Sequence, residues 1–188
     1  MRTRATLQIV VVSLLLVACC NAVAATSLEK MSIEKMAGAA QMIVRAQCVA
    51  NAAQWEAGEI WTFTTFEVSE SWKGAASQRV TVRLLGGTVG GVTSHVSGVP
   101  RFRVGEGVIL FLEPTRRADF TVVSWQQGTF RIGRDQRSGV EIVTQDTATF
   151  ETFDPATRQF RATGIRHMPL DDFRARVKEA LTQPGRKS

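Results

Sequence analysis

Three apolar runs between residues 59 and 114 constrain the fold more than any other feature of the sequence. Residues 60–72 and residues 79–85 alternate between apolar and polar side chains, and residues 108–112 are apolar without interruption. Alternation with a period of two is typical of strands that bury one face, whereas a run that is apolar throughout fits a strand buried on both faces. We therefore expect two half-buried strands and one central strand here.

Shorter runs on both sides predict further strands. We expect a first strand at residues 41–50, followed by a polar connection at 51–58. The glycine-rich residues 86–100 fit either a long loop or a loose hairpin. Pro114 should end the central strand. Beyond it we predict strands at residues 120–125, 128–132 and 140–144, and an edge hairpin at residues 147–162.

One helix is predicted near each end of the mature chain. Residues 27–40 should form a short helix with Ser32 as its N-cap. Near the C-terminus, Pro169 should open an amphipathic helix, because apolar residues recur after it at helical spacing. These residues are Leu170, Phe173, Val177 and Leu181.

Short strands separated by turns, with no strand–helix–strand alternation, predict a mainly β fold. We expect a small antiparallel barrel that is closed or nearly closed, flanked by the two helices. A chain of 188 residues fits one domain of this kind. We assign the domain to residues 25–182 and a frayed tail to residues 183–188.

The N-terminus has the layout of an export signal. Arg2 and Arg4 precede an apolar run at residues 9–18, which is too short to span a membrane as a mature helix. Two processing routes are open. Cleavage after Ala24 would release residues 1–24, whereas a lipobox-like sequence ending at Cys19 would remove residues 1–18 and place a lipid there. Either route predicts a protein outside the cytoplasm, in the periplasm, in the cell envelope or secreted, that meets a membrane only through its signal peptide or lipid anchor.

The basic bias of the chain is mild. The formal charge is +6, and loss of Arg2 and Arg4 leaves 21 basic against 17 acidic residues. Many arginines alternate along predicted strands, as Arg83, Arg101 and Arg131 do, which predicts a solvated face. A basic module that binds a polyanion of the envelope is the alternative, and nucleic acid is not an expected partner of an exported protein.

The sequence offers few residues for catalysis and predicts neither a metal nor a cofactor. It contains two histidines, His95 and His167, and no metal-binding spacing. Cys48 lies in an alternating run, which predicts that it is a small buried apolar residue. A small hydrolase that uses Cys48 or Ser94 with His95 remains an alternative, provided that the fold brings these side chains together.

The predicted strands also carry a family resemblance. Residues 43–46, Phe66-Glu67-Val68 leading to Trp72-Lys73-Gly74, and Gly105-Glu106 before the central strand resemble netrin-like domains, which include the tissue inhibitors of metalloproteinases. The likeness covers about residues 41–113 and implies a five-stranded OB-type barrel. The chain also looks like a set of exported bacterial proteins of unassigned function, through its Gly-Gly-x-x-Gly-Gly loop and residues 127–131.

The inhibitory site of that family has no counterpart here. Its members use a disulfide-tied N-terminal cysteine to bind the protease zinc, whereas this mature chain would begin at Ala25 or at a lipid-blocked Cys19. We therefore predict a non-enzymatic exported protein that binds an unknown protein or envelope component, with protease inhibition as one version. The residues proposed to contact this partner are Gly87, Gly90, Gly91, Ser94, His95, Trp61 and Trp125.

Overall fold

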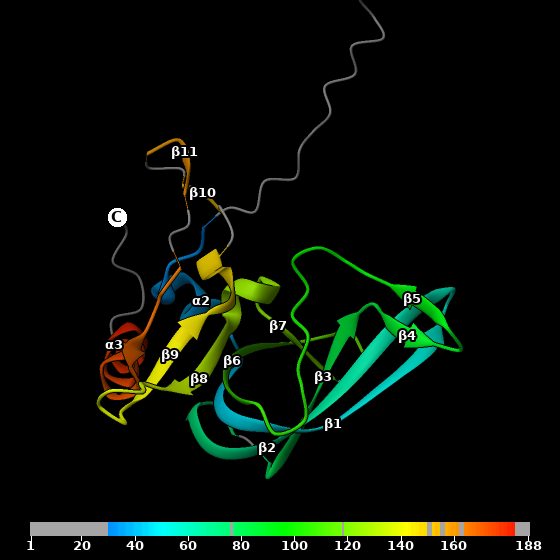
Figure 1. The fold of residues 1–188 in the computed structure, drawn as a ribbon, viewed down its shortest axis with the longest axis horizontal. Coiled ribbons are helices and arrows are strands. Elements are labelled where there is room, and N and C mark those ends of the chain that lie inside the picture. The colour runs from blue at the N-terminus through cyan, green and yellow to red at the C-terminus, as the bar shows by residue number, and fades with distance from the viewer. Residues whose placement is uncertain are drawn as a thin grey trace, which may run out of the picture.

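The computed structural model describes residues 30–182 apart from 76, 118, 150–151, 155–156 and 162–163, and it is mainly β (Figure 1). The main sheet consists of β1 (Met42–Glu56), β2 (Glu59–Lys73), β3 (Arg79–Leu85), β6 (Gly107–Pro114), β7 (Phe120–Val122), β8 (Thr129–Arg134), β9 (Glu141–Gln145) and β12 (Met168–Pro169). Two small hairpins are formed by β4 (Gly87–Val89) with β5 (Val92–Ser94) and by β10 (Thr152–Asp154) with β11 (Gln159–Arg161). The helices are α2 (Ile33–Ala39) and α3 (Leu170–Thr182), with short 3-10 turns η1 (Trp125–Gly128) and η2 (Asp146–Thr149).

The main sheet curls partly into a ring. Its strands follow the order β1-β2-β3-β7-β6-β8-β9-β12, and β1 also pairs with β6. The ring therefore comprises β1, β2, β3, β7 and β6. Its β3–β7 junction is parallel and has a single paired position, Val82 with Phe120. The strands β8, β9 and β12 continue the sheet outward from β6 (Figure 1).

Strand β6 separates two hydrophobic cores, as its uninterrupted apolar sequence predicted. Its residues Val108, Leu110 and Leu112 face the ring interior, where they pack among the buried residues of β1, β2 and β3. Ile109 and Phe111 face the opposite side and pack against the helices. All five side chains are fully buried, so one strand contributes to both cores.

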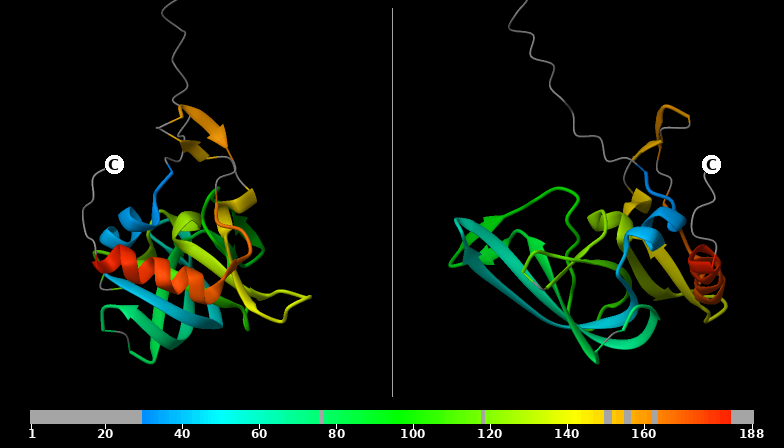
Figure 2. Two further views of the ribbon diagram at one scale, coloured as in Figure 1. Left: turned by 90° about the vertical axis from the view of Figure 1, so that its left-hand side faces the viewer. Right: turned by 180° about the vertical axis from the view of Figure 1, so that it is seen from behind.

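The two helices cover the side of the sheet outside the ring (Figure 2). Ser32 caps α2 as predicted, and its Oγ accepts a hydrogen bond from the Lys35 amide at 3.2 Å. Helix α3 begins directly after Pro169 and buries the predicted residues Leu170, Phe173 and Val177. Of the residues expected in the first helix, 27–29 lie outside the described residues, and the helix itself spans only 33–39.

The predicted polar connection at residues 51–58 is wrong, because most of it is strand. Strand β1 runs to Glu56, and the chain turns at Ala57 and Gly58, whose φ angles are 51° and 84°. Two consecutive residues with positive φ form the tight turn that suits a right-twisted hairpin. The hairpin of β1 and β2 is therefore long, and its far half extends beyond the region where β1 meets β6.

Of the two alternatives for residues 86–100, the structure shows the hairpin, whereas two other predicted segments differ. Residues 86–100 contain the β4–β5 hairpin, whose turn uses Gly90 and Gly91 at φ angles of 57° and 81°. The strand predicted at 120–125 ends at Val122, because Ser124 and Trp125, the first residue of η1, adopt positive φ. The hairpin of β10 and β11 forms its own two-stranded sheet instead of an edge of the main sheet.

The helices of the described residues are too short or too polar to cross a membrane.

Candidate functional site

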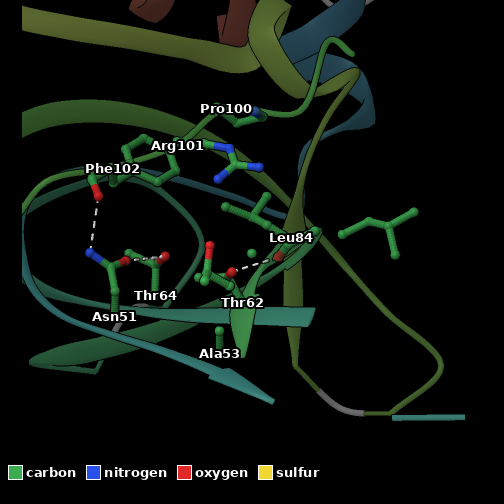
Figure 3. A pocket seen from close by; sticks show the side chains of 12 residues that line it. Asn51, Ala53, Thr62, Thr64, Leu84, Pro100, Arg101 and Phe102 are labelled. Atoms are coloured by element: carbon green, nitrogen blue, oxygen red, sulfur yellow. Dashed lines mark hydrogen bonds between the residues drawn. The ribbon is translucent and has the colours of Figure 1, made fainter. Parts of the chain in front are cut away.

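A cavity of about 340 Å³ lies at the mouth of the ring, beside the far half of the β1–β2 hairpin (Figure 3). Strand β1 pairs with β6 only from Met42 to Gln47. Beyond Gln47, β1 is bonded instead to the connection between β5 and β6, residues 95–106, which we call the crossing segment because it crosses the mouth of the ring. Cys48 N donates to Glu106 O and Gly105 N donates to Cys48 O, at 2.9 and 2.8 Å. The lining residues are Asn51, Ala53, Thr62, Thr64, Leu84, Leu85, Gly86, Gly87, Thr88, Pro100, Arg101 and Phe102.

One wall of the cavity is polar and held in place by side-chain hydrogen bonds. Thr64 Oγ1 donates to Asn51 Oδ1 at 2.7 Å, and Asn51 Nδ2 donates to the Phe102 carbonyl at 3.0 Å. Thr62 Oγ1 donates to the Gly86 carbonyl at 2.6 Å. These bonds join the β1–β2 hairpin to Gly86, directly after β3, and to Phe102 before β6 (Figure 3).

Glycine is required where the β4–β5 hairpin lies against β1 and β2. A Cβ on Gly87 would lie 2.4 Å from Thr62 Oγ1 and 3.1 Å from Ala53 Cβ. Gly86 has a φ of 94°, and a Cβ there would lie 2.8 Å from the Ser94 carbonyl oxygen. The glycines therefore permit a close backbone approach. By contrast, a Cβ on Gly90 or Gly91 would meet nothing within 4 Å, because these residues form the exposed turn.

Arg101 supplies the positive charge of the cavity. Its guanidinium lies on the side opposite Thr62 and Asn51 (Figure 3) and donates one hydrogen bond, from Nη2 to the Ser94 carbonyl at 2.9 Å. The residues that line the cavity include no carboxylate. Across the described ranges, no ion pair involves Arg101. This cation therefore faces the cavity without an acidic partner.

A second arginine, Arg131 on β8, holds the segment that carries Arg101. Its Nε and Nη2 donate to the Asp146 carboxylate at 2.6 and 2.8 Å, and Nη2 also donates to the Arg101 carbonyl at 2.8 Å. It forms an ion pair with Glu106 and lies over the Phe102 ring, 5.1 Å from the centroid. Burial by itself lowers the pKa of the Arg131 guanidinium, but the hydrogen bonds and charges of Asp146 and Glu106 raise that pKa overall.

Trp61, a predicted partner contact, lies on the outer face of the ring and not at its mouth. Arg83 from β3 covers its ring, with the guanidinium carbon 4.0 Å from the centroid. Arg83 Nη2 lies 2.6 Å from Glu56 Oε2, and Glu56 also forms an ion pair with Arg117. Since Arg83 is only 7% exposed, the expectation that it belongs to a solvated basic face is wrong. The Arg131 side chain is 27% exposed and forms ion pairs with Glu106 and Asp146, so it is only partly solvated.

Trp125 contacts the crossing segment at Gly98. The residue is 38% exposed and has a φ of 51°, which is unusual for a bulky side chain. Gly98 packs against its ring, since a Cβ on Gly98 would lie 3.6 Å from Trp125 Cε3. Gln126 N donates to the Gly98 carbonyl at 3.3 Å. Trp125 therefore supports the crossing segment and exposes part of its ring to solvent.

The residues named for a hydrolase lie in different environments. Cys48 is fully buried in the ring interior, and its polar neighbours are Asn51 Nδ2 at 3.7 Å and the Ala50 carbonyl at 4.0 Å. Burial raises the pKa of the Cys48 thiol, which disfavours the reactive thiolate. Ser94 ends β5, and His95 is exposed after it. In the described part of the chain, no hydrogen bond joins His95 to either residue.

Comparisons of this chain with protein-family models, curated proteins and solved structures found no match. Among the described residues, no group of three or more His, Cys, Asp or Glu side chains could hold a metal ion.

The structure brings some of the predicted contact residues together and separates others. Gly87 lines the cavity, and Ser94 adjoins it by accepting a hydrogen bond from Arg101. The residues that sequence reasoning missed are Asn51, Thr62, Thr64, Arg101 and Phe102. The alternation of β2 placed Thr62 and Thr64 on the inward face. The sequence does not indicate that Arg101 would lie opposite them.

Proposed function

We propose that this protein is an exported, non-enzymatic binding module, built on an OB-like barrel, that holds a partner at the mouth of its ring. The strand order β1-β2-β3-β7-β6 with return to β1 and a parallel β3–β7 junction supports the OB-like description. The composition of residues 1–24 supports export. Cys48 is fully buried whereas His95 is exposed, and this difference favours binding over hydrolysis.

The observation that carries this proposal is the cavity of about 340 Å³ at the ring mouth. Its volume falls in the range of about 300–1,000 Å³ in which ligand sites are found. It combines apolar walls with a few fixed polar groups, which is the usual composition of a recognition site. The cavity lies between strands of the sheet and the crossing segment, and loops that are held against a sheet commonly carry binding residues.

Site-specific photocrosslinking tests the location of the partner. A photoreactive amino acid replaces Thr88, which is exposed and lines the cavity, in cells that produce the protein. The matched control carries it at Glu67, which is exposed on the same sheet but does not line the cavity. We expect one discrete crosslinked product from Thr88 and none from Glu67. No product from either position, or the same products from both, would refute the proposal.

The export route is tested by the intact mass of the protein purified from the producing cells. The mass of a chain that starts at Ala25 would indicate cleavage after Ala24, and the mass of a chain that starts at Cys19 with added acyl groups would indicate a lipoprotein. The mass of a chain that still includes residues 1–24 would contradict export.

A further inference from the structure

The cavity presents positive charge on one side only. Arg101 has five N–H donors, and one donates to the Ser94 carbonyl. The others remain for a ligand, and a carboxylate matches the planar fork of a guanidinium better than a single point acceptor does. Because the lining residues include no acid, an anionic group of a ligand would meet no like charge there.

The opposite wall presents acceptors. The hydroxyl hydrogens of Thr62 and Thr64 are used in bonds to the Gly86 carbonyl and to Asn51 Oδ1. The Asn51 amide donates to the Phe102 carbonyl and lies 3.7 Å from Cys48 Sγ. The side-chain oxygens of Thr62, Thr64 and Asn51 can therefore still accept hydrogen bonds from a ligand, but their donors are already used. This wall therefore suits a ligand that brings N–H donors, and it disfavours a multiply charged anion such as phosphate.

Apart from Thr88, whose hydroxyl shares a hydrogen bond with that of Thr93, the remaining lining side chains are apolar. Leu84, Leu85 and Ala53 come from the strands, whereas Pro100 and Phe102 come from the crossing segment. A ligand that satisfies all three surfaces has a carboxylate, an N–H group a few atoms away and an apolar body. An acylated amino acid has this arrangement, and so does the last residue of a peptide chain.

We propose that the cavity binds the C-terminal end of a peptide, with its carboxylate at Arg101, its last amide N–H toward Thr62, and its last side chain against Leu84 and Phe102. This assignment rests on the proposed binding function and specifies the partner. A free N-acyl amino acid has the same chemistry in smaller form, so the test must separate the two sources.

The probe is an N-acetylated tetrapeptide mixture randomised at its last two positions, titrated into the mature protein as free acids and, separately, as C-terminal amides. Isothermal titration measures affinity, and ¹H–¹⁵N chemical shifts locate binding. We expect the acids to bind at the cavity. The amides should bind at least about tenfold more weakly, because a charge-assisted bidentate contact is lost. Randomised N-acetyl amino acids form the third arm, and binding as tight as that of the peptides would assign the site to the smaller molecule.

The matched variants are Arg101→Ala and Arg103→Ala. Both side chains are exposed on the same segment, but only Arg101 lines the cavity. The preference for acid over amide should disappear in the first variant and persist in the second. Equal binding of acids and amides, no binding of either, or equal effects of both substitutions would overturn the assignment. If the assignment fails while the crosslinks from Thr88 remain, the proposed binding function still stands.

Discussion

The two halves of the β1–β2 hairpin differ in their surroundings although the pairing between the strands continues through both. In the near half, β1 pairs with β2 on one side and with β6 on the other, and side chains such as Ile43 and Val44 are fully buried. In the far half, β1 pairs only with β2, and residues such as Gln54 and Trp55 are exposed. A register shift between Cys48 and Ala50 marks the boundary.

This difference indicates a division of roles within one pair of strands. The near half closes the ring and contributes to both cores, whereas the far half has one face free to form the cavity. Stability and binding should therefore respond to substitutions in different halves. The predictions below test that division, from the largest expected effect to the smallest.

Ile43→Ala should cause the largest loss of stability. Ile43 is fully buried among the residues that pack against the helices, and removing such a side chain lowers the free energy of unfolding by about 2–5 kcal/mol. The control is Gln54→Ala in the far half, which should change it by less than about 0.5 kcal/mol. Urea denaturation followed by circular dichroism measures both. Similar losses for the two variants would contradict the division.

Arg131→Gln should weaken the link between β8 and the crossing segment. The substitution leaves Asp146, whose side chain is 13% exposed, without its main partner, and we expect a loss of about 2 kcal/mol. Hydrogen exchange should quicken at residues 101–106 and stay unchanged at 42–47. Arg134→Gln, an exposed position on the same strand, is the control and should leave exchange unaltered at both.

Thr64→Val tests the polar wall of the cavity with little change in shape. It removes the hydrogen bond to Asn51 Oδ1, and loss of such a bond lowers the free energy of unfolding by about 1 kcal/mol. Thr65→Val, on the other face of the same strand, should have almost no effect. Peptide binding should weaken in the first variant alone. Unchanged binding and stability would show that this wall is dispensable.

Glu70→Gln should have the smallest effect, and only above acidic pH. Burial raises the pKa of Glu70, but hydrogen bonds from Trp72 and Arg45 and the charge of Arg174 lower it below 4.5 overall. The stabilisation is therefore complete above pH 4.5 and is lost as the pH falls through the lowered pKa. Because the side chain is 35% exposed, the difference at pH 7 should be below about 1 kcal/mol. Urea midpoints from pH 7 to pH 3 should converge, and a constant difference would contradict this reading.

The sequence predicted the elements that have a clear hydrophobic pattern. The strand at residues 79–85, the central position of residues 108–112 and the C-terminal helix after Pro169 match the structure. Each of them buries a regular set of side chains, so its period is visible without knowledge of its neighbours. The far half of β1 was missed because it buries little, and its polar sequence resembles a connection.

The cavity could not be predicted because its residues come from segments distant in sequence. Asn51 meets Thr64 through the register of the hairpin, and Arg101 reaches the same cavity because Arg131 holds its segment from β8. Neither relation leaves a local pattern. The positive φ of Trp125 is equally invisible in sequence, since few non-glycine residues adopt it.

The position of β6 between the two cores has a consequence for how the molecule melts. Residues such as Leu110 and Phe111 are neighbours in sequence but belong to different cores. Loss of this strand would expose both cores at once, so neither can survive as an independent folding unit. Calorimetry should accordingly record one heat absorption peak, with equal calorimetric and van't Hoff enthalpies.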